Sequence, residues 1–310
     1  MIKARAPGSI MLMGEHAVLF GHRAIACAVD KYIEVELRPR ADNLVVIDSV
    51  LAQYRSTLEE LDSEPALSFV LVAIKSVRAC CDSGFELKIS AGFSSTVGLG
   101  SSAAVSAAVM AVLLRFTGQS AGKREIFQKA LAVVHEVQGG RGSGTDLAAS
   151  VYGGLIGYSI EPRQVQPLPV PNDQLPHLSL HYCGYKMKTP DVLAYVEQRS
   201  AESPELFRSI YQLMHQTSVA AEQAILAADF VQLGRLMDIY QGLMEALGVN
   251  DATLSGMIWS LRQQTGVQAA KISGSGLGDC VLALGDAQPL TGFEKIEFAI
   301  STTGVEFDGN

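Results

Sequence analysis

The feature that most constrains the fold of this chain is a helix-forming stretch that begins directly after a glycine turn. Small and apolar side chains occupy nearly every position from Ser101 to Phe116, and Gly98 and Gly100 precede them. A helix that is apolar on all sides is stable in water only where other elements bury it. The sequence therefore predicts a buried helix over 101–116 at the centre of a core.

The same turn has the character of an anion-binding site. Glycines let the backbone approach a phosphate closely, and the free amides at a helix start carry partial positive charge. The hydroxyl of Ser101 or Ser102 fits a helix cap, and it also fits a Mg²⁺ ligand. A plain glycine turn with a serine cap explains the same residues, so both interpretations are open. A Walker loop is excluded, because no Gly-Lys-Ser/Thr follows.

Two further glycine-rich segments have polar ends. Gly139 to Asp146 ends in a carboxylate, the type of group that orients or deprotonates a hydroxyl during phosphoryl transfer. Asp146 fits equally well as the N-cap of a short helix over 147–151. Lys271 to Asp279 lies between two predicted strands, as either a loose hairpin or a loop that closes over a nucleotide or substrate.

Composition and charge exclude several classes of function. The 310 residues, 48% of them hydrophobic, leave room for one or two cores. A formal net charge of -8 does not supply the basic face that nucleic acid requires. The longest apolar stretch, 103–114, is shorter than the roughly 20 residues of a membrane span, and no secretory leader pattern is present. Five cysteines without a CxxC pair predict buried thiols. We therefore expect a soluble, cytoplasmic protein.

Prolines divide the chain into two parts. Five of them lie between Glu161 and Pro176, a density that interrupts helices and central strands alike. We place a domain boundary here, between residues 1–165 and 166–310. Both parts mix predicted strands and helices, which is typical of an α+β fold. The predicted strands are 33–37, 85–89, 178–182, 267–272 and 280–284, and the predicted helices are 65–80, 101–116, 123–137 and several between 190 and 264.

Three motifs in this order resemble those of the GHMP kinase superfamily, named after galactokinase, homoserine kinase, mevalonate kinase and phosphomevalonate kinase. They are residues 6–21, with Ala6-Pro7-Gly8 and Gly14-Glu15-His16, residues 98–104, and residues 274–278. The resemblance implies a ribosomal protein S5 domain 2-like N-terminal domain and a ferredoxin-like C-terminal domain. It also implies an active site in the cleft between them, ATP and Mg²⁺ as cofactors, and a homodimer.

Within the superfamily, Gly14 to Val18 followed by Gly21, and Tyr240 to Val249, are similar to segments of the mevalonate kinases. This similarity implies phosphorylation of the primary hydroxyl of mevalonate. The roles carried over are Asp146 as base, Gly98, Leu99, Gly100, Ser101, Ser102 and Ala103 for the nucleotide, Ser102 and Glu136 for Mg²⁺, and Glu15, His16, Thr189, Gly274 and Ser275 for the substrate. Taken alone, His16 also fits a core histidine and Thr189 a helix cap.

The chain departs from the family pattern at two positions. Ser9 replaces the basic residue that most of these kinases carry after Pro-Gly, and our hypothesis is that Lys3, Arg5 or Lys186 supplies the charge from another direction. By glycine register the second metal-binding glutamate aligns with His135. We choose Glu136, one residue later, because Mg²⁺ prefers a carboxylate to an imidazole.

Other segments resemble the phosphomevalonate kinases, namely Gln138 with 142–148, and Asp279-Cys280. Phosphomevalonate is therefore the alternative substrate, with Arg141, Lys186 and Lys188 as candidates for its phosphate. A non-catalytic protein that senses a metabolite or nucleotide is the alternative of another class. The presence of Asp146 and Ser102 favours catalysis, because a sensor has less need of a base.

Overall fold

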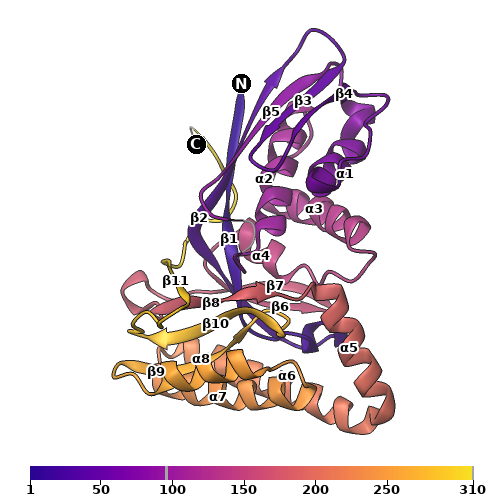
Figure 1. Ribbon diagram of the computed structural model, residues 1–310. Coiled ribbons are helices and arrows are strands. Elements are labelled where there is room, and N and C mark those ends of the chain that lie inside the picture. Colours follow the sequence, from indigo (N-terminus) through magenta and orange to yellow (C-terminus); the bar gives the residue numbers. More distant parts are fainter. Residues whose placement is uncertain (95–96, 309–310) are drawn as a thin grey trace.

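The computed structural model describes residues 1–94 and 97–308 and shows two units, each with a β-sheet and helices (Figure 1). The first sheet contains β1 (Ile2–Met13), β2 (Ala24–Pro39), β3 (Leu44–Ser49), β4 (Gln53–Thr57), β5 (Phe85–Ala91), β6 (Leu155–Ile160), β7 (Arg163–Leu168) and β12 (Glu306–Phe307). The second contains β8 (Leu178–Lys186), β9 (Val267–Ser273), β10 (Gly278–Gly285) and β11 (Glu294–Glu297).

The α-helices are α1 (Ser68–Val77), α2 (Ser101–Phe116), α3 (Lys123–Val137), α4 (Thr145–Tyr152), α5 (Thr189–Glu202), α6 (Pro204–Leu226), α7 (Phe230–Leu247) and α8 (Ala252–Arg262). Short 3₁₀ helices are η1 (Ala17–Phe20), η2 (Pro65–Leu67), η3 (Arg78–Cys80) and η4 (Asn172–Gln174). The first four α-helices belong to the first unit, and α5 to α8 belong to the second (Figure 1).

Helix α2 lies at the centre of the first unit. It packs against β1 and β2 and also against α1, α3 and α4. Most of its residues are fully buried, including the small side chains that let neighbouring elements approach closely. The prediction of a buried helix over 101–116 is confirmed with the same bounds.

The other elements that hydrophobic periodicity predicted are also present. Helix α3 has the predicted bounds, and the helix predicted over 65–80 consists of η2, α1 and η3. The predicted strands lie within β2, β5, β8, β9 and β10. Strand β1 was not predicted, because Pro7 and Gly8 interrupt its pattern and β1 shifts register against β2 at this point.

Strands β1 and β2 separate two hydrophobic cores, because successive side chains of a strand point to opposite faces. Ala24 and Ala26 of β2 belong to the core that surrounds α2. Ile25 of β2, with Ile10 and Leu12 of β1, belongs to the core of the second unit. The first sheet therefore holds the two units together through apolar contact on both faces.

The second sheet is antiparallel, with the strand order β11-β8-β10-β9. Helix α7 packs on β9, and α8 packs on β9 and β10. Figure 1 shows α6, α7 and α8 together on one face of this sheet. The other face turns toward the first unit, so the loop between β9 and β10 is directed at the junction.

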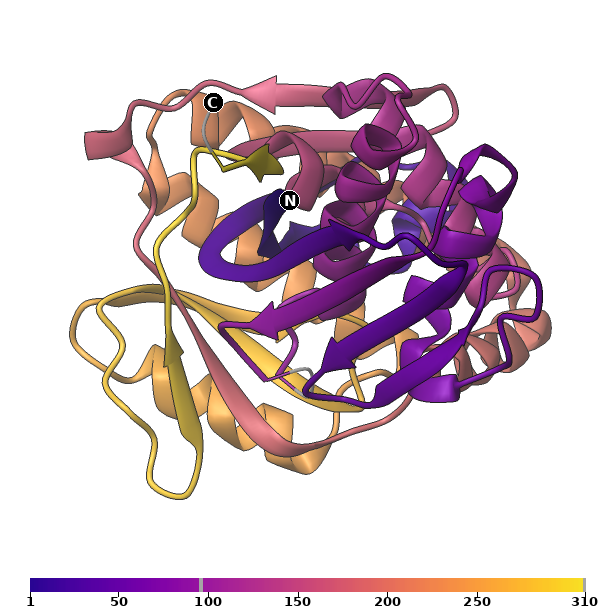
Figure 2. The same ribbon diagram turned by 90° about the horizontal axis from the view of Figure 1, so that it is seen from above.

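The strand pairing bears on the domain boundary. Strand β7 spans the predicted division at 165/166 and pairs with β6 as an edge strand, a place where Pro167 is tolerated. The chain later returns to the first unit, because β12 pairs with β1, and Figure 2 shows the yellow C-terminal segment beside the indigo strand. We propose a boundary after Leu168, with residues 299–308 rejoining the first unit.

No helix in the described residues is long and apolar enough to cross a membrane. All five cysteines are free thiols. Cys27, Cys183 and Cys280 are buried and Cys81 is partly buried, but Cys80 is exposed because η3 lies at the surface. The expectation of five buried thiols is therefore wrong at Cys80.

Tyr240 of α7 ties the end of β1 to the second unit. Its buried hydroxyl accepts a hydrogen bond from Gly14 N at 3.0 Å and donates one to Glu15 O, also at 3.0 Å. The hydroxyl of Ser273 adds a bond to Met11 O at 3.3 Å. These contacts fix the first motif against the second sheet.

Tyr240→Phe will therefore destabilise the protein. It leaves the buried Gly14 N without its partner, at a cost of about 1–3 kcal/mol, whereas Glu15 O keeps the bond from Ala17 N, so we expect a loss of about 1–3 kcal/mol in urea unfolding. Tyr195→Phe is the control, because Tyr195 is an exposed residue of α5 and should change stability by no more than about 0.5 kcal/mol. Equal stabilities of the two variants would contradict this account of the junction.

Candidate active site

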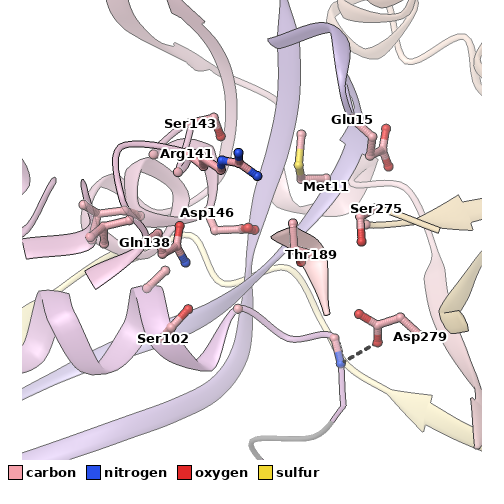
Figure 3. A pocket seen from close by; sticks show the side chains of 18 of the residues that line it. Met11, Glu15, Ser102, Gln138, Arg141, Ser143, Asp146, Thr189, Ser275 and Asp279 are labelled. Carbon is pink, nitrogen blue, oxygen red and sulfur yellow. Dashed lines mark hydrogen bonds between the residues drawn. The ribbon is translucent and has the colours of Figure 1, made fainter. Parts of the chain in front are cut away.

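A cleft of about 460 Å³ lies between the two units and is lined by the first motif, the glycine turn, the loop before α4, the start of α5 and the loop after β9. In Figure 3, Ser102, Gln138 and Asp146 face Ser275 and Asp279 across it, with Thr189 between them. The cleft brings together these predicted residues: Glu15, His16, Gly98, Leu99, Gly100, Ser101, Ser102, Ala103, Asp146, Thr189, Gly274 and Ser275. Glu136 is missing from its lining.

The glycine turn sets the N-terminus of α2 at the cleft wall. Gly100 is the N-cap residue in the left-handed conformation (φ 62°), so Ser101 and Ser102 are the first helical residues and neither occupies the cap position. A side chain at Gly100 is excluded, since its Cβ would lie 2.1 Å from Ser9 Oγ. The first amides of α2 therefore remain directed at the cleft, as an anion site requires.

Ser9 connects this turn to the predicted base. Its backbone N donates to Leu99 O at 3.0 Å, and its hydroxyl donates to Asp146 Oδ1 at 3.0 Å. Asp146 lies in the first turn of α4, and Gly144 holds the N-cap position, so the N-cap interpretation of Asp146 is wrong. A single residue, Ser9, thus links the Asp146 carboxylate to the glycine turn.

Burial raises the pKa of Asp146 above its ordinary value, and the negative charge of Asp279 adds to this effect. The hydrogen bond from Ser9 and the positive charge of Lys186 act in the opposite direction. A carboxylate with a raised pKa accepts a proton more readily than an exposed one, which suits a base that works on an alcohol.

The loop between β9 and β10 closes against the glycine turn. Asp279 Oδ1 accepts a hydrogen bond from Gly98 N at 3.1 Å, and Asp279 Oδ2 pairs with Lys186 Nζ at 2.5 Å. Asp279 has a φ of 71°, which costs a non-glycine residue about 1 kcal/mol. The hairpin interpretation is confirmed, since the segment joins two antiparallel strands. Its residues also line the cleft, and the prediction that it closes over a nucleotide or substrate stays a prediction.

The first motif ends in a buried ion pair. Lys271 Nζ donates to Glu15 Oε1 and to Ile272 O, both at 2.5 Å, and both charged side chains are fully buried. Burial raises the pKa of Glu15 and lowers that of Lys271, while each partner's charge opposes the shift of the other. Among the described residues, no hydrogen-bond partner reaches the buried Glu15 Oε2, and Glu15 lines the cleft, so this oxygen is available to a donor from a ligand.

His16 lies beside this pair and joins the third loop. Its Nε2 lies 2.8 Å from Ser275 O, and because a carbonyl only accepts, Nε2 carries the proton. Nδ1 is then an acceptor. Burial lowers the pKa of His16, which favours the neutral ring. The residue therefore has a structural bond, as a core histidine would, and also a place in the cleft lining.

Comparison with known proteins identifies the family. The models "GHMP kinases N terminal domain" and "GHMP kinases C terminal" match residues 68–154 and 221–296. A mevalonate kinase of Pyrococcus furiosus is 34% identical over 301 residues, 91% of this chain and 88% of its own length. One of Thermococcus onnurineus is 32% identical over 303 residues, 91% and 89% of the two chains. The chain belongs to the GHMP kinases. The predicted resemblance is confirmed, and with it an ATP-dependent small-molecule kinase.

Solved structures share the fold of this GHMP kinase. A Lin0012 protein from Listeria innocua has a TM-score of 0.83 at 22% identity, over 99% of this chain and 100% of the other. A mevalonate kinase of L. major in complex with R-mevalonate has a TM-score of 0.79 at 20% identity, over 97% and 96%. A Streptococcus pneumoniae phosphomevalonate kinase in complex with phosphomevalonate and AMPPNP has 0.76 at 21%, over 96% and 100%. The predicted two-domain α+β fold is confirmed.

The structure does not bring Glu136 to the cleft. This residue lies on the exposed side of α3, while His135 Nε2 bonds to Gly142 O at 2.9 Å. One residue corresponds to a turn of about 100° around a helix, so a carboxylate at 136 faces solvent. Gln138 and Arg141, from the loop that follows, line the cleft instead.

A magnesium ion fits this GHMP kinase only as part of the nucleotide complex. The described residues contain no group of three or more His, Cys, Asp or Glu side chains placed to hold a metal. Mg²⁺ at kinase sites takes one or two protein ligands and obtains the rest from phosphates and water. Ser102, in the first turn of α2 and in the cleft lining, fits such a partial site.

A second cavity of about 470 Å³ begins on the other side of the same helix start. Ser101 and Ser102 line both cavities. The second is largely apolar, and Leu51, Leu67, Phe69 and Ile89 contribute to its wall. An apolar pocket that opens beside a phosphate site has the character of a pocket for a flat base.

Three functional residues have roles that sequence reasoning missed. Lys271 is the buried partner of Glu15, and the signal was a lone charge inside the apolar strand segment 269–272. Asp279 binds the glycine turn, a contact that only the folded chain reveals. The sequence singled out Ser9 because it lacks the expected charge. In the structure its hydroxyl holds Asp146 through a hydrogen bond.

Gly100→Ala tests the geometry of the turn. The new methyl group collides with Ser9 Oγ, so we expect ATP affinity, measured by isothermal titration calorimetry, to fall at least tenfold. Gly118→Ala is the matched control, because Gly118 has a similar φ of 66° but no atom within 4 Å of its added Cβ. Equal ATP affinities of the two variants would contradict the claim that the contact between position 100 and Ser9 controls nucleotide binding.

Lys271→Met tests the buried ion pair. Removal of one buried partner leaves an uncompensated charge, which costs about 3–5 kcal/mol, so urea unfolding should show a loss of this size. Adding Glu15→Gln removes the stranded charge and should restore about half of the loss or more. Simple additivity of the two single effects would contradict the coupling.

Proposed function

We propose that this GHMP kinase transfers the γ-phosphoryl group of MgATP to the primary hydroxyl of mevalonate, forming 5-phosphomevalonate and ADP as a step toward isoprenoid precursors in the cytoplasm. The observation that carries the proposal is the double hydrogen bonding of Ser9, which sets Asp146 beside the phosphate-binding turn. The choice of mevalonate as substrate rests on the mevalonate kinases that are similar to this chain over about nine-tenths of its length.

The two cavities divide the substrates between them. The apolar cavity beside Ser101 and Ser102 receives the base of the nucleotide. The phosphates then cross the N-terminus of α2, where backbone amides and the helix dipole stabilise their charge. Ser102 would help to hold the Mg²⁺ of the nucleotide complex, and this ion would neutralise further negative charge. The cleft on the far side, which Asp146 lines, is left for the alcohol.

The proton balance of the transfer depends on Asp146. The hydroxyl oxygen of the alcohol forms a bond to the γ-phosphorus while the bond from that phosphorus to the β–γ bridging oxygen breaks. Asp146 accepts the hydroxyl proton, and the bridging oxygen leaves with ADP. The raised pKa of Asp146 keeps this carboxylate basic, and the hydrogen bond from Ser9 fixes the orientation of the carboxylate.

The remaining cleft groups suit the other polar atoms of mevalonate. Glu15 Oε2, which no hydrogen-bond partner reaches among the described residues, accepts a hydrogen bond from the tertiary hydroxyl. Arg141, exposed at the cleft, pairs with the substrate carboxylate. Thr189 begins α5 and offers a hydroxyl at the same cleft; its N-cap interpretation is wrong, since Lys188 holds that position.

A coupled assay of ADP release with mevalonate, phosphomevalonate, homoserine and galactose tests the proposal. We expect turnover with mevalonate, with a kcat/KM at least 100-fold above that for the other three. Higher turnover with phosphomevalonate would show that phosphomevalonate is the substrate, while the reaction would still be a phosphoryl transfer from ATP. Tight ATP binding without turnover of any of them would favour the sensor and reject the kinase.

Asp146→Asn keeps the shape of the side chain but removes the base. Loss of a general base costs about 10²–10⁴ in rate, so we expect kcat to fall by this factor while the KM for ATP stays within threefold. Asp173→Asn, at an exposed position of η4, should leave both constants unchanged. A kcat of Asp146→Asn within fivefold of the wild type would remove Asp146 from the reaction.

A further inference from the structure

The cleft collects negative charge before a triphosphate enters it. Glu15, Asp146 and Asp279 all line it. Glu15 is compensated by buried Lys271, whereas Asp146 has only the neutral hydroxyl of Ser9 as a hydrogen-bond partner among the described contacts. Phosphoryl transfer adds further negative charge beside Asp146, so a positive charge near this carboxylate would matter.

The basic residues of β1 do not meet this need. Lys3 Nζ pairs with Glu36 at 2.6 Å, and Arg5 Nε donates to Glu306 Oε1 at 2.6 Å. Neither residue lines the cleft. Lys3 and Arg5, two of the three residues that the sequence offered as a source of positive charge, are therefore bound to carboxylates of β2 and β12.

Lys186, at the end of β8, does line the cleft. Its ammonium group is fixed by Asp279 at 2.5 Å, and the carboxylate of Asp279 is itself held by Gly98 N at 3.1 Å. Asp279 is almost buried, whereas the Lys186 side chain keeps 41% of its surface exposed. The cation is thus anchored to the glycine turn and still open to a ligand.

We propose that Lys186 is a positioning residue for the proposed phosphoryl transfer: anchored on Asp279, it reaches from the second unit to place beside Asp146 the positive charge that β1 does not supply. This inference rests on the proposed function for its catalytic consequence. Its electrostatic part concerns the free protein and is testable without any substrate.

The groups that surround Asp146 define what Lys186 must act against. Ser9 from β1 donates a hydrogen bond, and Cys27 from β2 stays a neutral thiol, because burial raises its pKa. Asp279 from β10 raises the pKa of Asp146, and Lys186 from β8 lowers it. Glu15, His16 and Arg141 complete the charged and titratable lining of the cleft. Lys186 is thus the neighbour whose removal should raise this pKa.

The test measures the pKa of Asp146 by carbon-detected NMR of the carboxyl group in the free protein, with Asp146→Asn identifying the signal. Lys186→Met should raise this pKa by about one unit, the lower end of the effect of a nearby opposite charge. Asp279→Asn removes a negative neighbour and the anchor of Lys186 together, so it does not isolate the charge of Lys186. Lys186→Arg, which keeps the charge, should stay close to the wild type.

Kinetics then test the catalytic part. In Lys186→Met, kcat should fall at least tenfold, and the acidic limb of the kcat/KM profile should move to higher pH by the shift that NMR shows. Lys129→Met is the control, because Lys129 is exposed on α3 and does not line the cleft. It should leave rate and profile unchanged.

The outcomes separate the two proposals. An unchanged pKa of Asp146 in Lys186→Met overturns the inference about Lys186, whatever the rate. A shift in Lys186→Arg as large as that in Lys186→Met overturns it too, since Lys186→Arg keeps the positive charge. A wild type without turnover of mevalonate rejects the proposed function, while the expected NMR shift would still support the electrostatic role of Lys186.

Discussion

The structure of this GHMP kinase depends on the two hydrogen bonds of one small buried residue. Ser9 binds Leu99 O through its backbone and Asp146 through its hydroxyl, so strand β1, the glycine turn and the Asp146 carboxylate are joined at one residue. This arrangement requires glycine at position 100, because any side chain there would overlap the serine hydroxyl. A serine in this place thus excludes a bulky cation from β1 and leaves the charge to be supplied from across the cleft.

The second unit completes the site rather than merely covering it. Tyr240, Lys271 and Ser275 all bond to the segment that ends β1, and Asp279 reaches the glycine turn itself. A buried ion pair such as Glu15 with Lys271 is costly to desolvate, and an apolar pair of similar volume would stabilise the fold as well. Its value lies in holding a charged oxygen at the cleft wall. The two units therefore form one site, and stability and substrate binding meet at their junction.

Sequence reasoning succeeded where a residue's environment follows from its neighbours along the chain. Helix α2 could be predicted with its bounds because its apolar residues leave no polar face. The glycine-rich segments could be assigned to one cleft because three motifs occurred in the family order. It failed where a contact joins distant segments. The family pattern placed position 9 close to Asp146, but nothing near Ser9 indicates a hydrogen bond between them, and nothing near Lys271 indicates that its partner is Glu15.

Other differences come from geometry that a linear pattern does not fix. Glu136 was chosen for its chemistry, but the rotation of α3 directs position 136 to solvent. The serines after Gly100 resemble helix caps, yet the left-handed glycine takes the cap position. The proline-rich segment predicted a domain boundary at 165/166, and part of this segment forms edge strand β7 of the first sheet. In each case residue type was informative, and the direction of the backbone decided the outcome.

The central claim is that the start of α2 and the carboxylate of Asp146 take part in the same phosphoryl transfer. The start of α2 binds the phosphates, and Asp146 binds the hydroxyl that attacks them. The most direct measurement is a crystal structure with a non-hydrolysable ATP analogue, Mg²⁺ and mevalonate. The account predicts phosphates on the first amides of α2 and the primary hydroxyl within hydrogen-bond distance of Asp146. A nucleotide bound away from Gly98 to Ser102, or a mevalonate hydroxyl directed away from Asp146, would contradict it.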